Sequence, residues 1–302
     1  MSRIRLGTRG STLALAQANW VKAQIEARGD NVVELSIIKT SGDRFVDTAI
    51  QNIGSKGVFT KEIEDALLNN EIDLAVHSMK DLPTELPDGL AIIAVPERED
   101  ARDVLVTSKG ARLAELASGA KLGTSSLRRR AQLLHYRPDI SVVNLRGNVD
   151  TRLKKLDAGA VDGLVMAAAG LKRIGRQARI TEYLDASVCV SAVAQGALGI
   201  EARADSPLRQ VLSFLNHAAT HTCVRAERAF LRRLSGGCHL PVGGHAVITD
   251  RQLILLGIVA QPDGQLLHRG ELSGPIDGAE KLGEQLGEKL LAEGAAKILA
   301  AV

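Results

Sequence analysis

The stretch LGTRGSTLALAQ, residues 6–17, and its weaker echo LGTSSLRRRAQ, residues 122–132, decide the fold expected for this chain. In both, an apolar run ends in Leu-Gly-Thr and small hydroxyl residues open a helical pattern. A second pair, LLNNEIDLAV at 67–76 and LDAGAVDGLV at 156–165, repeats a helix-to-strand step. The shared order predicts an internal duplication, with two similar lobes facing each other across a cleft.

Short apolar runs alternate with amphipathic stretches, which is typical of parallel α/β sheets. Strands are predicted at 3–8, 32–40, 72–78, 120–124, 140–146 and 162–170, and helices at 11–28, 60–70, 125–136 and 149–159. The segments 95–103 and 190–199 are the expected crossings between lobes. After about residue 216 a helix, antiparallel strands and a closing helix indicate a smaller α+β unit.

Composition narrows the class of protein. The 302 residues are 45% apolar, enough for more than one core, and only 2% aromatic, which argues against a nucleic-acid surface built on stacked rings. The N-terminus lacks a signal-peptide pattern and no 18-residue apolar run occurs, so we expect a soluble cytoplasmic protein without a membrane anchor.

Basic residues gather at the ends of predicted strands and in the turns that follow. They are Arg9, Lys56, Arg128, Arg129, Arg130, Arg146, Arg152, Lys172 and Arg173. Any one of them could be a solvated surface residue, but ligands of open α/β sheets bind at this edge, where helix N-termini also favour anions. This set of basic residues predicts that the ligand is a large polyanion. Carboxylates are favoured over phosphates because no phosphate-binding glycine loop is present, and no nucleic-acid motif is found.

Against this basic background, VHSMKDLP at 76–83 presents Asp81 at the end of an apolar strand. A carboxylate there weakens anion binding, so one interpretation is that Asp81 stabilises a developing cation or handles a proton. The alternative is an aspartate that caps a turn before proline. His77 is taken as an ordinary strand residue.

Cys238 lies between glycines in LSGGCHLPVGG, residues 234–244, where a bulky partner can reach its sulfur. No CxxC spacing is present, and Cys189 sits in an apolar run as a small buried hydrophobe. His217, His221 and Cys223 could ligate zinc, but no fourth ligand is evident and no metal is expected. A covalent anchor for a ligand fits Cys238 better than a catalytic triad.

Eight stretches, in order, resemble the porphobilinogen deaminase family, also called hydroxymethylbilane synthases. They are GTRGSTLALAQ, DLAVHSMKDLP, EREDARD, GTSSLRR, LRGNVDTRL, AAAGLKR, AVAQGALGIE and GGCHLPVG, between residues 7 and 243.

The resemblance implies an α/β fold with two similar doubly wound lobes, like periplasmic binding proteins, and a small α+β C-terminal domain. The first lobe would be discontinuous, comprising residues 1–96 and 196–215, with the second lobe at 102–190 and the cofactor-anchoring domain at 218–302. A monomer is expected.

The resemblance also implies a transferase of tetrapyrrole and heme biosynthesis. Such enzymes condense four porphobilinogen molecules head to tail with loss of ammonia and release hydroxymethylbilane. The chain grows on one dipyrromethane cofactor, held by a thioether to the loop cysteine, here Cys238. Its acetate and propionate groups would be the polyanion.

The family's residue roles carry over by position, with Asp81 as the catalytic carboxylate. Cofactor-binding residues would be Cys238, Ser78, Lys80, Thr124, Ser126, Arg128, Arg129, Arg146 and Arg152. Substrate-binding residues would be Arg9, Ser11, Gln17 and Arg173. Lys56 and Phe59 would belong to a flap over the site.

Two positions depart from many members of the family: His239 follows the cysteine in place of Gln, and Asn52 stands where some members have Lys. The rival interpretations are a solute-binding protein, a cysteine hydrolase or transferase that uses Cys238 as a free nucleophile, and a nucleic-acid binder.

Overall fold

The computed structural model describes residues 3–29, 31–44, 60–234 and 240–301. The chain forms two compact units, Met1–Arg98 with Ala197–His221, and Glu99–Gly196 with Thr222–Val302. Both units are therefore assembled from two separate stretches of sequence. Within the described residues, no helix is both long and apolar enough to cross a membrane.

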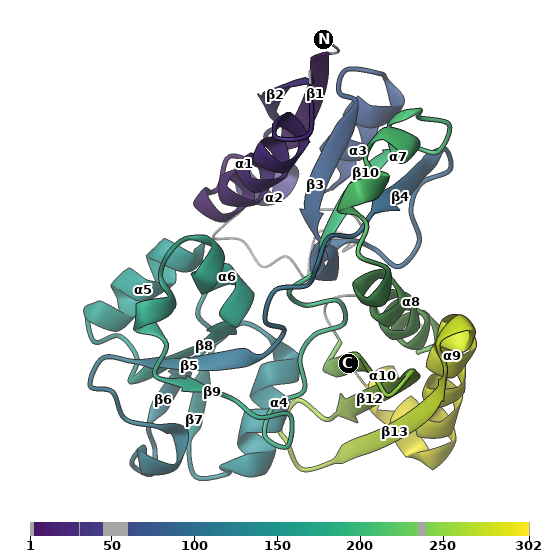
Figure 1. Cartoon of the computed structure of the whole chain (residues 1–302). Helices are drawn as coiled ribbons and strands as arrows, with labels where there is room; N and C mark the ends of the chain where they lie inside the picture. The colour runs from purple at the N-terminus through teal and green to yellow at the C-terminus, as the bar shows by residue number, and fades with distance from the viewer. Residues whose placement is uncertain (1–2, 30, 45–59, 235–239, 302) are drawn as a thin grey trace. The chain divides into compact units, whose positions relative to one another are not determined.

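The first unit contains a five-stranded sheet in the order β2-β1-β3-β10-β4 (Figure 1). Its strands are β1 (Arg3–Thr8), β2 (Val32–Ile37), β3 (Leu74–Ser78), β4 (Leu90–Ala94) and β10 (Leu198–Arg203). Strand β1 runs parallel to β2 and β3, whereas β10 is antiparallel to both of its neighbours. The returning chain thus closes a sheet that the first 98 residues begin.

Helices cover both faces of this sheet. They are α1 (Thr12–Glu26), α2 (Ser41–Arg44), α3 (Lys61–Leu68) and α7 (Leu208–Val211), with short 3₁₀ turns η2 (Met79–Asp81) and η5 (Ser213–Leu215). Val21 and Ile25 of α1 pack with Leu6 and Val76 in one core, and Ile63 and other residues of α3 form a second core.

The second unit repeats the arrangement in the order β7-β6-β8-β5-β9. Its strands are β5 (Asp103–Thr107), β6 (Lys121–Gly123), β7 (Ser141–Val143), β8 (Gly163–Ala167) and β9 (Glu182–Tyr183). Again the centre is parallel, and the strand beside it, here β5, is antiparallel to both neighbours. The two sheets therefore share one topology, as the internal duplication predicted.

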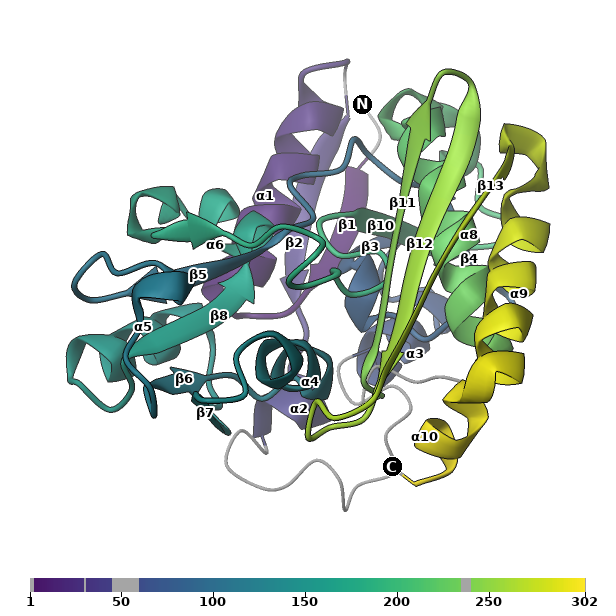
Figure 2. The ribbon, with the colours of Figure 1, turned by 90° about the horizontal axis from the view of Figure 1, so that it is seen from below.

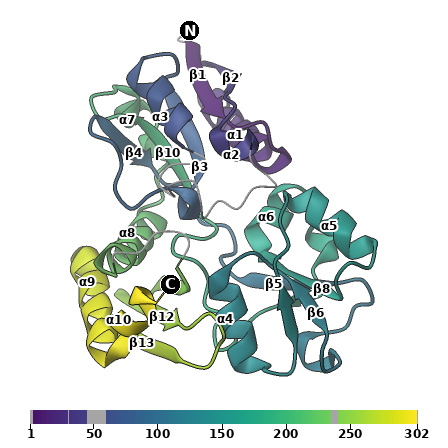
Figure 3. The same cartoon turned by 180° about the vertical axis from the view of Figure 1, so that it is seen from behind.

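The helices of this sheet are α4 (Leu127–Tyr136), α5 (Val149–Asp157) and α6 (Ala168–Arg173). Figure 3 shows α4 apart from α5 and α6. Leu133 of α4 joins one core, and Leu156 of α5 and Leu171 of α6 join another. The sheet is consequently covered on both faces.

The repeated Leu-Gly-Thr motif has a packing reason in each sheet. A Cβ atom on Gly7 would lie 2.3 Å from Cδ1 of Ile72, and one on Gly123 would lie 3.0 Å from Cδ2 of Leu164. The serine that follows caps the next helix: Ser11 accepts a hydrogen bond from the amide of Ala14 in α1, and Ser126 accepts one from Arg129 in α4.

A three-stranded antiparallel sheet completes the second unit, with β11 (Val242–Thr249), β12 (Gln252–Ala260) and β13 (Leu267–Pro275) (Figure 2). The helical segments near it are α8 (Ala218–Arg233), α9 (Ala279–Leu290), the π-helical turn η7 (Leu291–Ala295) and α10 (Ala296–Ala300). Phe230 of α8 and Leu286 of α9 approach Gly257 so closely that no side chain fits there.

The predicted fold class, two similar α/β lobes and a small α+β domain, is confirmed. Several details of the predicted strands were wrong. Strands β4, β5 and β9 were not predicted, and the strands expected at 32–40 and 140–146 end at Ile37 and Val143. The strand expected at 162–170 ends at Ala167 because Ala168 begins α6, and the crossing expected at 190–199 runs into strand β10. Strand β10 pairs with residues about 120 positions earlier, and local periodicity does not register such a pairing.

Candidate active site

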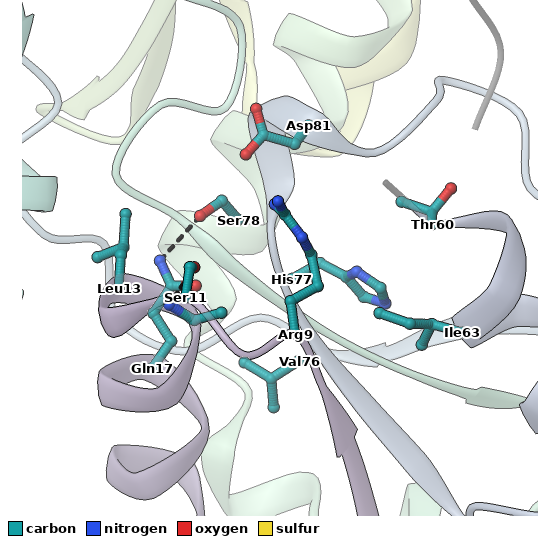
Figure 4. Close-up of a pocket in the computed structure, with 11 residues that line it drawn as sticks. Arg9, Ser11, Leu13, Gln17, Thr60, Ile63, Val76, His77, Ser78 and Asp81 are labelled. Atoms are coloured by element: carbon teal, nitrogen blue, oxygen red, sulfur yellow. Dashed lines mark hydrogen bonds between the residues drawn. The ribbon is translucent and has the colours of Figure 1, made fainter. Parts of the chain in front are cut away.

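A pocket of the first unit opens at the carboxyl ends of β1 and β3, which is the ligand edge of such a sheet. It is lined by Arg9, Ser11, Leu13, Ala14, Gln17, Thr60, Ile63, Val76, His77, Ser78 and Asp81 (Figure 4). The turn after β1, the start of α1, the end of β3 and the start of α3 supply these residues. Five predicted site residues, Arg9, Ser11, Gln17, Ser78 and Asp81, are thereby brought together.

Asp81 ends the short turn η2 and is exposed. Behind it, the buried Nε2 of Gln17 donates a hydrogen bond to Oγ of Ser78 over 2.8 Å. This bond ties α1 to the end of β3. Lys80, the other predicted residue of this turn, is half-buried beside it. The pocket therefore combines an exposed carboxylate with Arg9 and several hydroxyl and amide groups.

In the second unit, Arg128 and Arg129 turn inward. Nη1 of Arg128 lies 2.6 Å from Oδ2 of Asp103, and Nη2 of Arg129 lies 2.8 Å from Oδ1 of the same carboxylate. Burial would raise the pKa of Asp103, but the two guanidinium charges hold it well below its usual range. Arg128 also donates to the carbonyl of Val190 over 2.5 Å. Both cations therefore have a buried acidic partner.

Arg152 differs from these two. Burial, with a further contribution from the charge of Arg129, lowers the pKa of Arg152 to about 10. Its Nη2 donates weakly to Oγ of Ser125 over 3.4 Å, and its buried Nε has no hydrogen-bond partner among the described residues. Within the same ranges no carboxylate pairs with Arg152. A half-buried guanidinium without a carboxylate partner is suited to bind an anionic group of a ligand.

Arg152 belongs to α5 and contacts Ser125 in the loop before α4, and this loop and the start of α5 present further groups for an anion. Ser126 caps α4, Asn148 caps α5, and Oγ1 of the buried Thr124 accepts a hydrogen bond from the amide of Ser126 over 3.2 Å. Helix N-termini favour negative charge. Arg146 is half-buried just before α5.

Arg173, the remaining predicted arginine, ends α6. Burial lowers the pKa of Arg173 to about 10, although the charge of Glu99 opposes this shift. Its Nη2 donates to the carbonyl of Gly196 over 2.6 Å. Nζ of the preceding Lys172 lies 2.5 Å from Oε1 of Glu99. These bonds join α6 to both crossing segments within the second unit.

The thiols that the structure describes are poorly placed for chemistry. Cys189 and Cys223 are buried. Burial raises the pKa of Cys189 to about 12, and its Sγ donates to Oδ2 of Asp103 over 3.3 Å. Cys189 was expected to be a small buried hydrophobe, and the structure adds this polar contact. Cys238, His239, Asn52, Lys56 and Phe59 lie outside the described residues.

The histidines considered for zinc bind protein groups. Nδ1 of His217 lies 2.8 Å from Oγ1 of Thr220, and Nδ1 of His221 lies 2.9 Å from Oδ1 of Asn216. Across the described ranges, no group of three or more His, Cys, Asp or Glu side chains could hold a metal ion.

Sequence reasoning missed two buried carboxylates, Asp103 and Glu201. Asp103 closes the second sheet's arginine cluster, and Oε2 of Glu201 lies 3.0 Å from Nε2 of His77 in the pocket wall. The available signal was a single acid in a strongly apolar stretch, DVLVT and LGIEAR. Such an acid is buried only with a partner, which is a reason to look for one.

Two α/β sheets, each with cations and a helix N-terminus at the carboxyl ends of its strands, define the class of the protein as a duplicated α/β protein with strand edges that favour anions. A family model described as porphobilinogen deaminase, dipyromethane cofactor binding domain, matches residues 4–210, and one described as porphobilinogen deaminase, C-terminal domain, matches residues 221–292. The chain belongs to the porphobilinogen deaminase family.

Curated relatives agree along the whole chain. The porphobilinogen deaminase of Desulforudis audaxviator is 54% identical over 299 residues, covering 98% of this chain and 97% of that protein. Those of Pelobacter propionicus and Geobacter sulfurreducens are 51% and 50% identical, covering 98% and 100% of this chain and 96% and 95% of theirs. The predicted family, transferase class and dipyrromethane cofactor are confirmed.

Solved structures with a similar fold are more distant. An ancestral arginine-binding protein bound to arginine has a TM-score of 0.39 at 17% identity, covering 71% of this chain and 91% of that one. The periplasmic aliphatic sulphonate binding protein SsuA from Escherichia coli has a TM-score of 0.41 at 14% identity, covering 77% and 70%. At these scores they indicate nothing about ligand or activity.

Proposed function

We propose that this chain condenses four porphobilinogen molecules head to tail into hydroxymethylbilane, with Asp81 as the catalytic carboxylate. Asp81 is exposed in a pocket that also contains Arg9, Ser11 and Gln17. When the C–N bond of the substrate's aminomethyl group breaks and ammonia leaves, positive charge develops on the methylene carbon and the pyrrole ring. An ionised carboxylate in the pocket stabilises that charge, while Arg9 and Ser11 bind substrate carboxylates.

The observation that carries the proposal is the state of Arg152. Arg152 is half-buried, its Nε has no hydrogen-bond partner, its pKa is lowered to about 10, and no carboxylate pairs with it in the described part of the chain. A carboxylate from a ligand would supply the missing charge. A dipyrromethane, which bears acetate and propionate groups, has carboxylates that can pair with this guanidinium.

The cofactor-binding residues of the second unit would be Thr124, Ser126, Arg128, Arg129, Arg146, Arg152 and Cys238. Ser78 and Lys80 would contribute from the first unit, and Arg173 would bind substrate. When bound, the dipyrromethane supplies the pyrrole α carbon on which the first substrate is added. Lys56 and Phe59 would act as a flap. Because Arg128 and Arg129 already pair with Asp103, we assign them the further role of orienting the other cofactor-binding residues of the second unit.

Cys238 would hold the dipyrromethane through a thioether. The burial of Cys189 and Cys223 supports this assignment, since neither thiol is accessible to a ligand. Carried to the domain level, the proposal places lobe 1 at 1–96 with 196–215, lobe 2 at 102–190 and the anchoring domain at 218–302. Each of these contains one of the three sheets. We further propose a monomer located in the cytoplasm.

Intact mass spectrometry and a turnover assay with porphobilinogen test these assignments together. The purified protein should carry an adduct of two pyrrole units, and Cys238→Ser should lack it. Asp81→Asn should keep the adduct yet lose turnover by roughly 10²-fold or more, because the charge facing the developing cation is gone.

The matched control is Asp88→Asn, which removes an exposed carboxylate further along the same segment and should leave turnover unchanged. An unmodified mass in an active preparation would exclude the covalent cofactor. Near-normal turnover by Asp81→Asn would remove Asp81 from its role.

A further inference from the structure

The side chains of His77 and Glu201 are in close, buried contact directly behind the pocket. Strands β3 and β10 are antiparallel, with Ala75 opposite Glu201 and His77 opposite Gly199. Because side chains alternate between the faces of a sheet, Glu201 and His77 share one face and meet on the diagonal. Oε2 of Glu201 lies 3.0 Å from Nε2 of His77, and the two side chains are 0% and 6% exposed.

Glu64 of α3 adds a second buried carboxyl group on this face. Burial raises the pKa of Glu64 and the charge of Glu201 raises it further, while Thr60 and His77 oppose the shift. Oε1 of Glu64, both carboxylate oxygens of Glu201 and Nε2 of His77 have no well-aligned hydrogen-bond partner among the described residues. The 3.0 Å approach of His77 to Glu201 is therefore a close polar contact without hydrogen-bond geometry. The raised pKa favours the protonated form of Glu64 beside the carboxylate of Glu201.

The buried pair is joined to Asp81 through three residues of chain. His77 is followed by Ser78 and by the turn Met79–Asp81, whose first amide donates to the carbonyl of Ala197 over 3.0 Å. Met79 covers Gly199, where a Cβ atom would lie 2.3 Å from its sulfur. The segment is thus fastened to β10 at its backbone and by packing.

The two faces of β3 are held by different partners. On one face Gln17 donates to Ser78, and on the other Glu201 contacts His77. In Figure 4 the ring of His77 points toward Ile63, whereas Ser78 points toward Gln17. His77, Ser78 and Asp81 nevertheless line the same pocket.

We propose that His77 is a positioning residue for Asp81: Glu201 fixes the imidazole, and the fixed ring holds the end of β3 so that Ser78 and Asp81 keep the geometry required for condensation. The inference deepens the proposed function and rests on it. The charged groups that face this cluster are Arg9 and Asp81 across the pocket and Asp65 on α3, besides Glu64 itself.

Glu201→Gln tests the proposal because the amide keeps the shape of the carboxylate and removes its charge. The kcat for porphobilinogen consumption should fall about tenfold or more, as when a group that orients a functional side chain is lost, while KM stays unchanged. The pH dependence of kcat should change as well, since a buried carboxylate behind the pocket is replaced by a neutral amide. A purely structural role would lower the amount of active enzyme without moving the pH profile.

Two further variants keep the test decisive. The control Glu71→Gln makes the same substitution at an exposed position just before β3 and should behave as the native chain. His77→Gln should reproduce the fall in kcat, and the double variant His77→Gln/Glu201→Gln, whose amides can bond to each other, should be no worse than either single variant.

If Glu201→Gln does not fold, His77→Gln decides. Native kcat and a native pH profile in the folded variant would overturn the proposal. Failure of the native chain to condense porphobilinogen would instead refute the proposed function, so the two failures are distinguishable.

Discussion

The two five-stranded sheets have the same strand order, yet they bury different ionic groups. Each carries one carboxylate on the antiparallel strand beside its centre, Asp103 on β5 and Glu201 on β10. Asp103 meets two arginines, whereas Glu201 meets a histidine with Glu64 nearby. Arginine stays charged at all physiological pH values, but histidine and glutamate can exchange protons.

The depth of the two carboxylates differs as well. Asp103 begins β5 opposite Ala167, the last residue of β8, and so lies at the ligand edge. Glu201 lies opposite Ala75, three residues before the end of β3. The same strand order therefore supports different groups in the two sheets. The second sheet holds two arginines in fixed positions, and the first sheet holds His77 and Glu201 behind the exposed Asp81.

The largest effect is expected from Asp103→Asn. It leaves two buried guanidinium groups without their shared carboxylate, and breaking a buried pair in this way costs about 3–5 kcal/mol of unfolding free energy. Urea unfolding measures the loss. Asp157→Asn is the control, because its partner Arg179 is on the surface, and it should cost less than about 1 kcal/mol. Equal losses in the two variants would contradict a special role for the buried cluster.

Arg152→Leu should separate binding from stability. Removing a charged hydrogen-bond partner of a ligand carboxylate costs about 1.5–3 kcal/mol, so cofactor loading or turnover should fall about tenfold or more. Unfolding free energy should be unchanged or higher, since a half-buried charge without a carboxylate partner in the described ranges disappears. Arg130→Leu is the control, because Arg130 belongs to the same set of basic residues but is exposed. A variant that loads and turns over normally would argue against a carboxylate site at Arg152.

The helix caps test whether the repeated motif works alike in both sheets. Ser11→Ala and Ser126→Ala each remove a side chain that accepts a backbone amide at the start of a helix. Each should lower the unfolding free energy by about 1 kcal/mol. Thermal or urea unfolding should show similar losses of unfolding free energy in the two variants. Clearly unequal losses would show that the two motifs are alike in sequence but not in their contribution to stability.

The smallest effect concerns Glu64 and depends on pH. Because burial raises the pKa of Glu64, the folded chain keeps this proton at a pH where the unfolded chain has released it. Stability is therefore lost as the pH rises from the ordinary glutamate range through the raised value. Glu64→Gln cannot ionise, so its Tm should match the native value in acid and exceed it slightly at higher pH.

Asp103 should show the opposite dependence. Its pKa is held low, so the stability it contributes is present above the ordinary aspartate range and is lost on acidification. Thermal scans of Glu64→Gln, Asp103→Asn and the native chain across pH distinguish the two clusters. A Tm difference for Glu64→Gln that does not grow with pH would contradict the assigned protonation state.

Much of the fold was accessible from local pattern. Strands such as β1 and helices such as α1 follow from runs whose period is short, and the Leu-Gly-Thr echo identified the duplication. Strand β10 was not predicted, because its stability comes from pairing with β3 and β4 rather than from its own sequence. The discontinuous first lobe came only from the family resemblance.

The candidate site, like the fold, was predictable from the sequence only in part. The position of a basic residue after a strand predicts that it faces the ligand edge, and Arg9 and Asp81 do line one pocket. The pattern does not distinguish Arg128, which pairs with an aspartate 25 residues away, from Arg152, which has no acidic partner in the described ranges. His77 was taken as an ordinary strand residue because its partner lies on another strand.

By itself, the sequence determined the repeated strand-to-helix units, the cations at their ends and membership of the porphobilinogen deaminase family. These depend on short-range periodicity and on ordered motifs. Only the tertiary structure decided which charges are neutralised inside the protein. That choice depends on chain segments far apart in sequence that meet when β5 and β10 enter their sheets, where the low dielectric makes each pairing matter.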